Sequence, residues 1–236
     1  MRAILRTDVG RIRARNEDTA MIGNGFFVVC DGMGGHQAGD VASKMAVEII
    51  SRKLSSAPQT IPNLLHAIAA ANEDVFNASK GDSRLSGMGT TLTAMLADED
   101  QVVLAQVGDS RAYLYRGGVL RQCTHDHSVV AELVRSGTIT KEQARLHPQK
   151  NLITRSLGTE PEVDVDLFEI SRRKGDCWLL CSDGLTDLVT DAEMQNILYV
   201  TPLEKAADAL LALALAKGGS DNITLLLVQD TGGSLT

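Results

Sequence analysis

Residues 21–36 read MIGNGFFVVCDGMGGH, and this stretch indicates the fold class. The pair Asn24-Gly25 between apolar residues is a strong signal for a two-residue β-hairpin, because both residues tolerate positive φ. The apolar run at 26–30 reads as a strand, and it ends in Asp31-Gly32. Since hairpins join antiparallel strands, the stretch argues against an all-parallel sheet.

The rest of the chain extends this pattern. Short apolar runs predict strands at 3–7, 90–96, 102–107, 112–115, 177–182 and 223–228, with a second hairpin turn at Gly117-Gly118. Helical periodicity occurs in separate stretches, at 40–52, 64–75 and 203–215, rather than after every strand. Capping-box patterns begin at Thr140 and Thr201, and Asp40 is a candidate helix cap. Antiparallel strands with separate helix pairs predict an α+β fold of two packed sheets with helices outside.

Composition favours an ordinary globular protein. The 236 residues are 44% hydrophobic and 22% charged, and the net charge of 23 − 30 = −7 argues against binding to nucleic acid or to an anionic membrane. The chain shows neither a signal peptide nor an apolar run of the ~20 residues that a membrane span needs. We interpret the four cysteines as reduced thiols of a cytoplasmic protein.

We expect a single domain, residues 1–236, because no linker or repeat divides the chain. The pattern changes between 128 and 158, where short helical signals and His147-Pro148 suggest an excursion over the surface. Such a segment is either a functional element or a simple connector.

Aspartates stand at the ends of three strand-like runs. Asp31-Gly32 and Asp183-Gly184 follow apolar runs, and Asp221-Asn222 precedes one. A carboxylate at such a position is held rigidly, and a neighbouring glycine lets a backbone carbonyl approach a cation. Carboxylates and carbonyls are the ligands of Mg²⁺, Mn²⁺ and Ca²⁺. A single Asp-Gly pair, however, is usually just a turn.

Taken in order, seven motifs resemble those of the metal-dependent protein serine/threonine phosphatases, the PPM or type 2C family, in its compact bacterial form. They are RARNED at 13–18, DGMGGH at 31–36, GMGTT at 87–91, VGDSR at 107–111, THDHS at 124–128, SDGL at 182–185 and DNIT at 221–224. The resemblance implies a four-layer α-β-β-α sandwich, two mainly antiparallel sheets flanked by helix pairs, with 128–158 as a flap subdomain beside a two-metal cleft.

The resemblance also implies the roles of the metal-site residues. They are Asp31 as the carboxylate that bridges both metals, Gly32 as a carbonyl ligand, Asp183 and Asp221 as further ligands, Glu17 and Asp18 as holders of metal-bound waters, and Asp126 as a ligand, shared with Asp183, of a third and weaker metal. For Asp126, a cap or turn role is the alternative.

Two further residues have implied roles in catalysis. Arg13 matches the arginine that binds phosphate, where a guanidinium fork suits a dianion. Because seryl and threonyl alkoxides are poor leaving groups, a proton donor is needed. His36 is one candidate and metal-bound water is another, while ordering of the glycine turn is the alternative role for His36.

The implied activity is hydrolysis of phosphoserine and phosphothreonine in proteins at a binuclear Mg²⁺ or Mn²⁺ centre, with two tightly bound ions and a third weaker one. The implied partners are phosphorylated proteins and a cognate bacterial serine/threonine kinase in signalling, and we expect a monomer. Two alternatives are a hydrolase of small phosphate esters and a catalytically weak, metal-stabilised interaction module.

Overall fold

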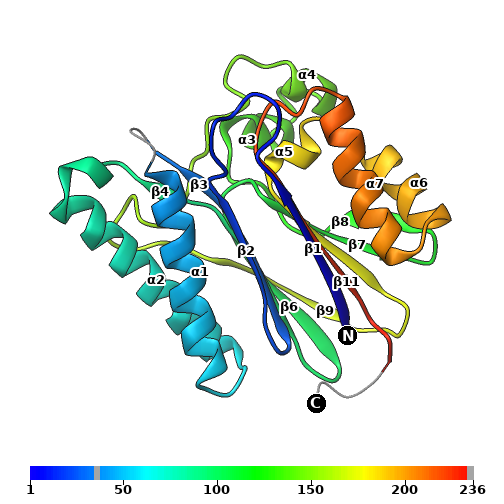
Figure 1. Ribbon diagram of the computed structural model, residues 1–236, viewed down its shortest axis with the longest axis horizontal. Helices are drawn as coiled ribbons and strands as arrows, with labels where there is room; N and C mark the ends of the chain where they lie inside the picture. Colours follow the sequence, from blue (N-terminus) through cyan, green and yellow to red (C-terminus); the bar gives the residue numbers. More distant parts are fainter. Residues whose placement is uncertain (35–37, 233–236) are drawn as a thin grey trace.

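The computed structural model describes residues 1–34 and 38–232 of the chain. Two twisted sheets pack face to face, with helices on both outer sides (Figure 1). Sheet A has the strand order β1 (Arg2–Asp8), β11 (Ile223–Gln229), β10 (Cys177–Cys181), β7 (Arg111–Arg116) and β8 (Val119–Gln122). Its neighbouring strands are all antiparallel. The first strand of the sequence, β1, pairs with the last, β11.

Sheet B is antiparallel as well. Its order is β2 (Asp18–Ile22), β3 (Phe26–Met33), β5 (Leu92–Ala97), β6 (Gln101–Val107) and β9 (Asp166–Ser171), and β4 (Gly89–Thr90) pairs with the end of β3. The hairpin predicted at Asn24-Gly25 joins β2 to β3, and Gly25 adopts φ 76°.

Helices complete the four layers. Sheet B is covered by α1 (Gly39–Ser55) and α2 (Ile61–Gly81), with the 3-10 turn η2 (Ser83–Leu85) after them, and sheet A is covered by α6 (Asp191–Val200) and α7 (Leu203–Ala216). The short α5 (Asp183–Thr186) follows β10 directly, whereas α3 (Val129–Arg135) and α4 (Lys141–Arg145) lie in the segment 128–158 that we predict to be a flap. The predicted α+β sandwich is confirmed.

Alternation along the strands builds three layers of core. In β3, Phe26, Val28 and Cys30 face α1 and α2, whereas Phe27 and Val29 face the other sheet. A third cluster fills the space between sheet A and the helices α6 and α7, where Leu210 is fully buried. Each such side chain contributes about 1.5–3 kcal/mol when it leaves water, and the result is a rigid frame for the strand ends.

The helix starts differ in detail from the prediction. Asp40 lies in the first turn of α1 and pairs with Lys44, while Ala38 is the cap residue. Helix α7 begins after Pro202 with no side-chain cap, so the capping box expected at Thr201 is wrong. A box does form at Thr140, as predicted, and another forms at Thr190 of α6.

A narrow base closes the flap. Ser128 and Ile153 form an isolated antiparallel bridge, Val129 N–H donates to the Leu152 carbonyl, and Thr154 N–H donates to the His127 carbonyl. The subdomain boundaries at 128–158 remain a prediction. Across the described ranges, no helix is both long enough and apolar enough to cross a membrane.

Candidate metal centre

The predicted aspartates lie at one end of the two sheets. On sheet B, Asp18 of β2 stands opposite Asp31 of β3 in the antiparallel register. On sheet A, Asp183 follows β10, and Asp221 precedes β11, its neighbouring strand. The strand ends therefore gather carboxylates from both sheets at one site, although these residues are far apart in the sequence.

Asp18 connects the two sheets. Its Oδ2 accepts a hydrogen bond of 2.7 Å from Ser182 Oγ, and Ser182 Oγ in turn accepts one of 3.0 Å from the Thr224 amide. Only 8% of Asp18 is exposed, and its Oδ1 is buried without a hydrogen-bond partner. A buried carboxylate oxygen without a donor calls for a further partner, such as a cation or an ordered water.

Hydroxyl groups hold the backbone of Asp31. Thr91 Oγ1 accepts the Asp31 N–H at 2.9 Å, and Thr90 Oγ1 donates to the Asp31 carbonyl at 2.9 Å. Thr91 Oγ1 also shares a 2.7 Å hydrogen bond with Ser110 Oγ. We expected Thr90 and Thr91 to be ordinary strand residues, but they position the central aspartate.

Backbone segments approach closely at two glycines. A Cβ at Gly32 would lie 2.1 Å from the Gly39 carbonyl oxygen and 2.5 Å from that of Glu17. A Cβ at Gly184 would lie 1.9 Å from the Asn222 carbonyl oxygen. Only glycine fits at these positions, because a side chain would force apart the segments that carry the aspartates.

Asn222 fastens the loop that contains Arg13. Its Oδ1 accepts the Glu17 N–H at 2.8 Å, while its Nδ2 donates to the carbonyls of Val9 and Arg15. Arg13 extends from this loop, and its Nη2 donates to Asp221 Oδ2 at 2.8 Å. The side chain of Arg13 is 52% exposed, so the guanidinium lies at the open side of the carboxylate group.

Mutual repulsion among the carboxylates is strong. Burial, followed by the charges of Asp18 and Asp183, raises the pKa of Asp31 well above its ordinary value. Burial likewise raises the pKa of Asp18 to about 6 and that of Glu17 above its ordinary value. Burial and then Asp109 raise the pKa of Asp183 most. A bound cation reverses this balance, since it stabilises the ionised carboxylates.

Within residues 1–34 and 38–232, no group of three or more His, Cys, Asp or Glu side chains is arranged to hold a metal ion directly. This spacing still suits Mg²⁺ and similar cations, which keep several waters and bind proteins through one or two carboxylates. Together with the donorless oxygen of Asp18, the all-oxygen set fits a hydrated divalent cation.

Asp126 has a different environment from the other predicted ligands. Arg111 donates to both of its carboxylate oxygens, and Gln122 Nε2 donates to Oδ1 at 2.8 Å. Asp126 is not among the carboxylates that raise the pKa of Asp183 most, whereas Asp109 is the first of them. Asp126 as a ligand of a third metal stays a prediction, and among the neighbouring charges that of Asp109 raises the pKa of Asp183 most.

Two predictions about residues at the site have different outcomes. His36 lies outside the described residues. Asp109 was given no role in the metal site, yet burial followed by the charge of Asp126 raises its pKa to about 7. The VGDSR motif was the signal that could have identified Asp109, and the register between β7 and β10 was needed to use it.

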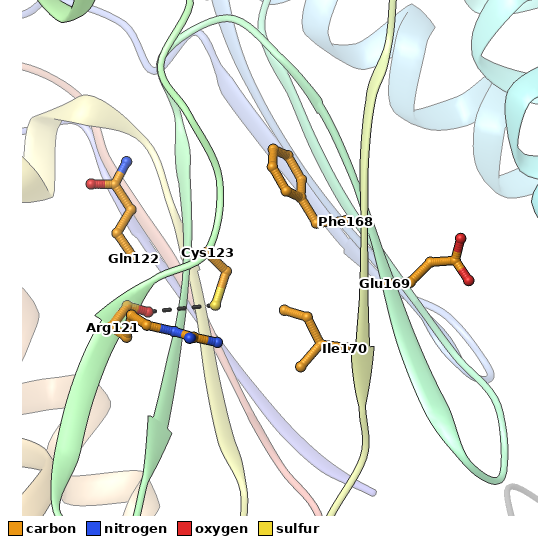
Figure 2. A pocket seen from close by; sticks show the side chains of 6 residues that line it. All are labelled: Arg121, Gln122, Cys123, Phe168, Glu169 and Ile170. Atoms are coloured by element: carbon orange, nitrogen blue, oxygen red, sulfur yellow. Dashed lines mark hydrogen bonds between the residues drawn. The ribbon is translucent and has the colours of Figure 1, made fainter. Parts of the chain in front are cut away.

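A cavity of about 370 Å³ lies elsewhere, between the edge strands β8 and β9. Figure 2 shows its two walls, with Gln122 and Cys123 on one side and Phe168 and Ile170 on the other. None of the aspartates described above lines it. It is therefore separate from the candidate metal centre.

Comparisons with known proteins agree with this geometry. The model of the family described as protein phosphatase 2C matches residues 14–217. The serine/threonine phosphatase stp of Listeria monocytogenes serotype 4b (strain F2365) is 46% identical over 241 residues, covering 97% of this chain and 96% of the relative.

Solved structures give the same result. The crystal structure of the Mycobacterium tuberculosis serine/threonine phosphatase PstP/Ppp matches with a TM-score of 0.90 at 40% identity, covering 96% of this chain and 97% of that one. The catalytic domain of PstP in complex with two manganese ions matches with a TM-score of 0.89 at 38% identity, covering 96% of each chain. On these matches along nearly its whole length, the chain belongs to the protein phosphatase 2C family.

Proposed function

We propose that this chain hydrolyses the phosphate monoesters of phosphoserine and phosphothreonine in proteins with the help of divalent cations. The single observation that supports this most is the gathering of Asp31, Asp183 and Asp221 from two sheets beside Arg13. The relatives are named serine/threonine phosphatases, and one related structure contains two manganese ions.

Each residue of the site has a proposed role. Asp31, Asp183, Asp221 and the Gly32 carbonyl would hold the cations, and Asp18 and Glu17 would orient waters around them. Bound Mn²⁺ or Mg²⁺ supplies positive charge for the phosphoryl oxygens and lowers the pKa of water. Arg13 lies at the open side, where its guanidinium binds and orients a phosphate dianion.

A third, weaker cation is also part of the proposal, with a changed ligand set. Asp109 and Asp183 are its proposed ligands, because Asp109 is the carboxylate that raises the pKa of Asp183 most. Asp126 is replaced in this role, since Arg111 and Gln122 already donate to its oxygens.

The cellular setting follows from weaker observations. We propose a cytoplasmic monomer that opposes a serine/threonine kinase. Cys30, Cys123, Cys177 and Cys181 are all free thiols, as in proteins of reducing compartments. Light scattering after size-exclusion chromatography measures the oligomeric state.

Phosphate release from peptides tests the activity. We expect Mn²⁺-dependent release from phosphothreonine and phosphoserine peptides, little release from a phosphotyrosine peptide, and none with excess chelator. Equal activity on all three peptides and on small phosphate esters would favour a general phosphate-ester hydrolase. No release under any metal condition, with Mn²⁺ still stabilising the fold, would favour the interaction module.

Arg13→Ala compared with Arg15→Ala tests the phosphate-binding role. We expect the first to raise KM and lower kcat, because a charge-assisted contact to a dianion contributes about 1.5–3 kcal/mol. Arg15 is an exposed arginine in the same loop and is the matched control. Mn²⁺ binding to Arg13→Ala measured by calorimetry should stay close to that of the wild type; its loss would make Arg13 a structural residue.

A further inference from the structure

Asp126 and Arg111 form a forked ion pair at the edge of the candidate metal centre. Arg111 Nε lies 3.0 Å from Asp126 Oδ1 and 2.9 Å from Oδ2, and Nη2 lies 2.7 Å from Oδ2. Gln122 Nε2 adds a fourth hydrogen bond of 2.8 Å to Oδ1. The side chains of Arg111 and Asp126 are only 25% and 10% exposed, so solvent screens the pair weakly.

This arginine stands next to carboxylates that the cations need. Arg111 pairs with Cys181 in the antiparallel register of β7 and β10. Asp109 stands two residues before Arg111, and Asp183 stands two residues after Cys181, at the start of α5. The ion pair of Arg111 and Asp126 therefore lies at the strand ends that lead to Asp109 and Asp183.

The permanent positive charge of Arg111 would repel a divalent cation bound nearby. The guanidinium does not lose its proton in proteins, and it has five N–H donors suited to carboxylates. Released from Asp126, Arg111 would be free to bind Asp109 or Asp183. It would then compete with a divalent cation for the same oxygens.

We propose that Asp126 is a positioning residue that holds Arg111 away from Asp109 and Asp183, instead of a metal ligand. The inference rests on the cation site proposed above for those two carboxylates. It gives Asp126 an effect on metal binding that depends entirely on Arg111. A ligand would act on the metal whether or not Arg111 were present.

A four-protein cycle separates these roles, with Mn²⁺ affinity measured by titration and free Mn²⁺ counted by electron paramagnetic resonance. Asp126→Asn should weaken the weakest-bound Mn²⁺ roughly tenfold or more, the scale on which a nearby charge changes the proton affinity of a carboxylate. Arg111→Met should bind Mn²⁺ at least as tightly as the wild type, because no guanidinium is left to compete for the carboxylates. The double variant should bind Mn²⁺ as tightly as Arg111→Met, because Asp126 then has no arginine to hold.

Two results would overturn the proposal. If Asp126 were a ligand, the double variant would bind Mn²⁺ more weakly than Arg111→Met by the same factor that separates Asp126→Asn from the wild type, and the proposal would be overturned. Asp126→Glu is a second test. Its carboxylate can still reach Arg111, so the variant should keep most of the Mn²⁺ affinity. Loss of affinity in Asp126→Glu with the Arg111 pair intact in a crystal structure would also contradict the proposal.

The same strand provides a matched control. At the other end of β7, Arg116 forks onto Asp176, with Nε 2.7 Å from Oδ1 and Nη2 2.6 Å from Oδ2. Asp176→Asn should lower the melting temperature and leave Mn²⁺ affinity unchanged. An equal loss of Mn²⁺ affinity in Asp176→Asn would show that any broken fork on β7 disturbs the site, and the specific role of Asp126 would be wrong.

Failure of the proposed third cation is distinguishable from failure of this inference. If the wild type binds two Mn²⁺ only, the third position is wrong, and the cycle is read on the weaker of the two ions. If it binds none, the proposed metal centre is wrong, and the cycle is read on melting temperature. In that case the melting temperature of the double variant should fall by less than the sum of the falls in the two single variants. Additive falls would overturn the ion-pair role.

Discussion

At the scale of single residues, the site is built from groups that repel one another. Asp31 lies opposite Asp18, and the charges of Asp18 and Asp183 raise its pKa after the effect of burial. The hydrogen bonds from Thr90 and Thr91 go to the backbone of Asp31 and leave the carboxylate available. The fold thus supplies the stability that this arrangement costs, as is common at functional sites.

Asp31→Asn should change function and stability in opposite directions. The variant removes a charge from the repelling group, so the metal-free protein should melt at a higher temperature. Mn²⁺ binding and phosphatase turnover should both be nearly lost, because the amide replaces a central anionic ligand. Melting curves with chelator, together with Mn²⁺ titration, check this; retained Mn²⁺ affinity would remove Asp31 from the proposed ligands.

Thr91→Val tests the support beneath Asp31. The change leaves the Asp31 N–H and the Ser110 hydroxyl without their shared partner. Unsatisfied buried groups of this kind cost about 1–3 kcal/mol, so the free energy of unfolding should fall by that amount. Thr138→Val, on the exposed part of the flap, is the control and should melt like the wild type. Equal stability of the two variants would contradict the supporting role.

At the scale of elements, strand registers decide which residues meet. Asp31-Gly32 and Asp183-Gly184 were recognisable because an apolar run ends in a turn signal at each. The proximity of Asp109 to Asp183 depends instead on how β7 pairs with β10, and spacing in the sequence does not contain that register.

Edge elements were also hard to predict. Strand β9 reads DLFEIS, which contains neither a continuous apolar run nor a strict alternation of apolar and polar residues, and it was missed. The predicted strands at 26–30, 177–182 and 223–228 correspond to central strands, whose continuous apolar runs reflect burial on both faces. Burial patterns thus found the core of each sheet more readily than its margins.

Asn72 of helix α2 holds the segment at residues 158–161 in place by hydrogen bonds. Its Oδ1 accepts the Gly158 N–H at 2.8 Å, and its Nδ2 donates to the carbonyls of Glu160 and Pro161. Asn72→Ala should therefore reduce the free energy of unfolding by about 1–3 kcal/mol. Asn77→Ala, on the exposed side of the same helix, serves as the control in denaturant unfolding. Similar losses in both would show that helix propensity, not anchoring, is measured.

At the scale of the whole molecule, the buried carboxylates predict an unusual dependence of stability on pH. Burial raises the pKa of Asp18 from 3.8 to about 6 and that of Asp109 from 3.8 to about 7. Between the unfolded and the folded pKa of each group, the folded protein binds more protons than the unfolded chain. The free energy of unfolding therefore falls as pH rises through this range. Ion-paired carboxylates such as Glu193, with a pKa of about 2, affect stability only at lower pH.

Without metal, the protein should therefore melt at a higher temperature near pH 5 than near pH 7.5. Saturating Mn²⁺ should reverse this trend, because cations bind the ionised carboxylates and stabilise the fold by mass action. Calorimetric melting over this pH range with chelator, and again with Mn²⁺, provides the measurement. A melting temperature that rises with pH in the presence of chelator would contradict the assigned pKa directions.

The pairing of β1 with β11 has a consequence for how the molecule comes into being. These two strands lie side by side although they are the first and the last of the described chain (Figure 1). A ribosome delivers the partner of β1 only after nearly all other strands have emerged, and Asp221 arrives with it. Contacts so distant in sequence also slow folding. We therefore expect the candidate metal centre to stay incomplete during synthesis, and phosphatase activity to begin only once translation has passed β11.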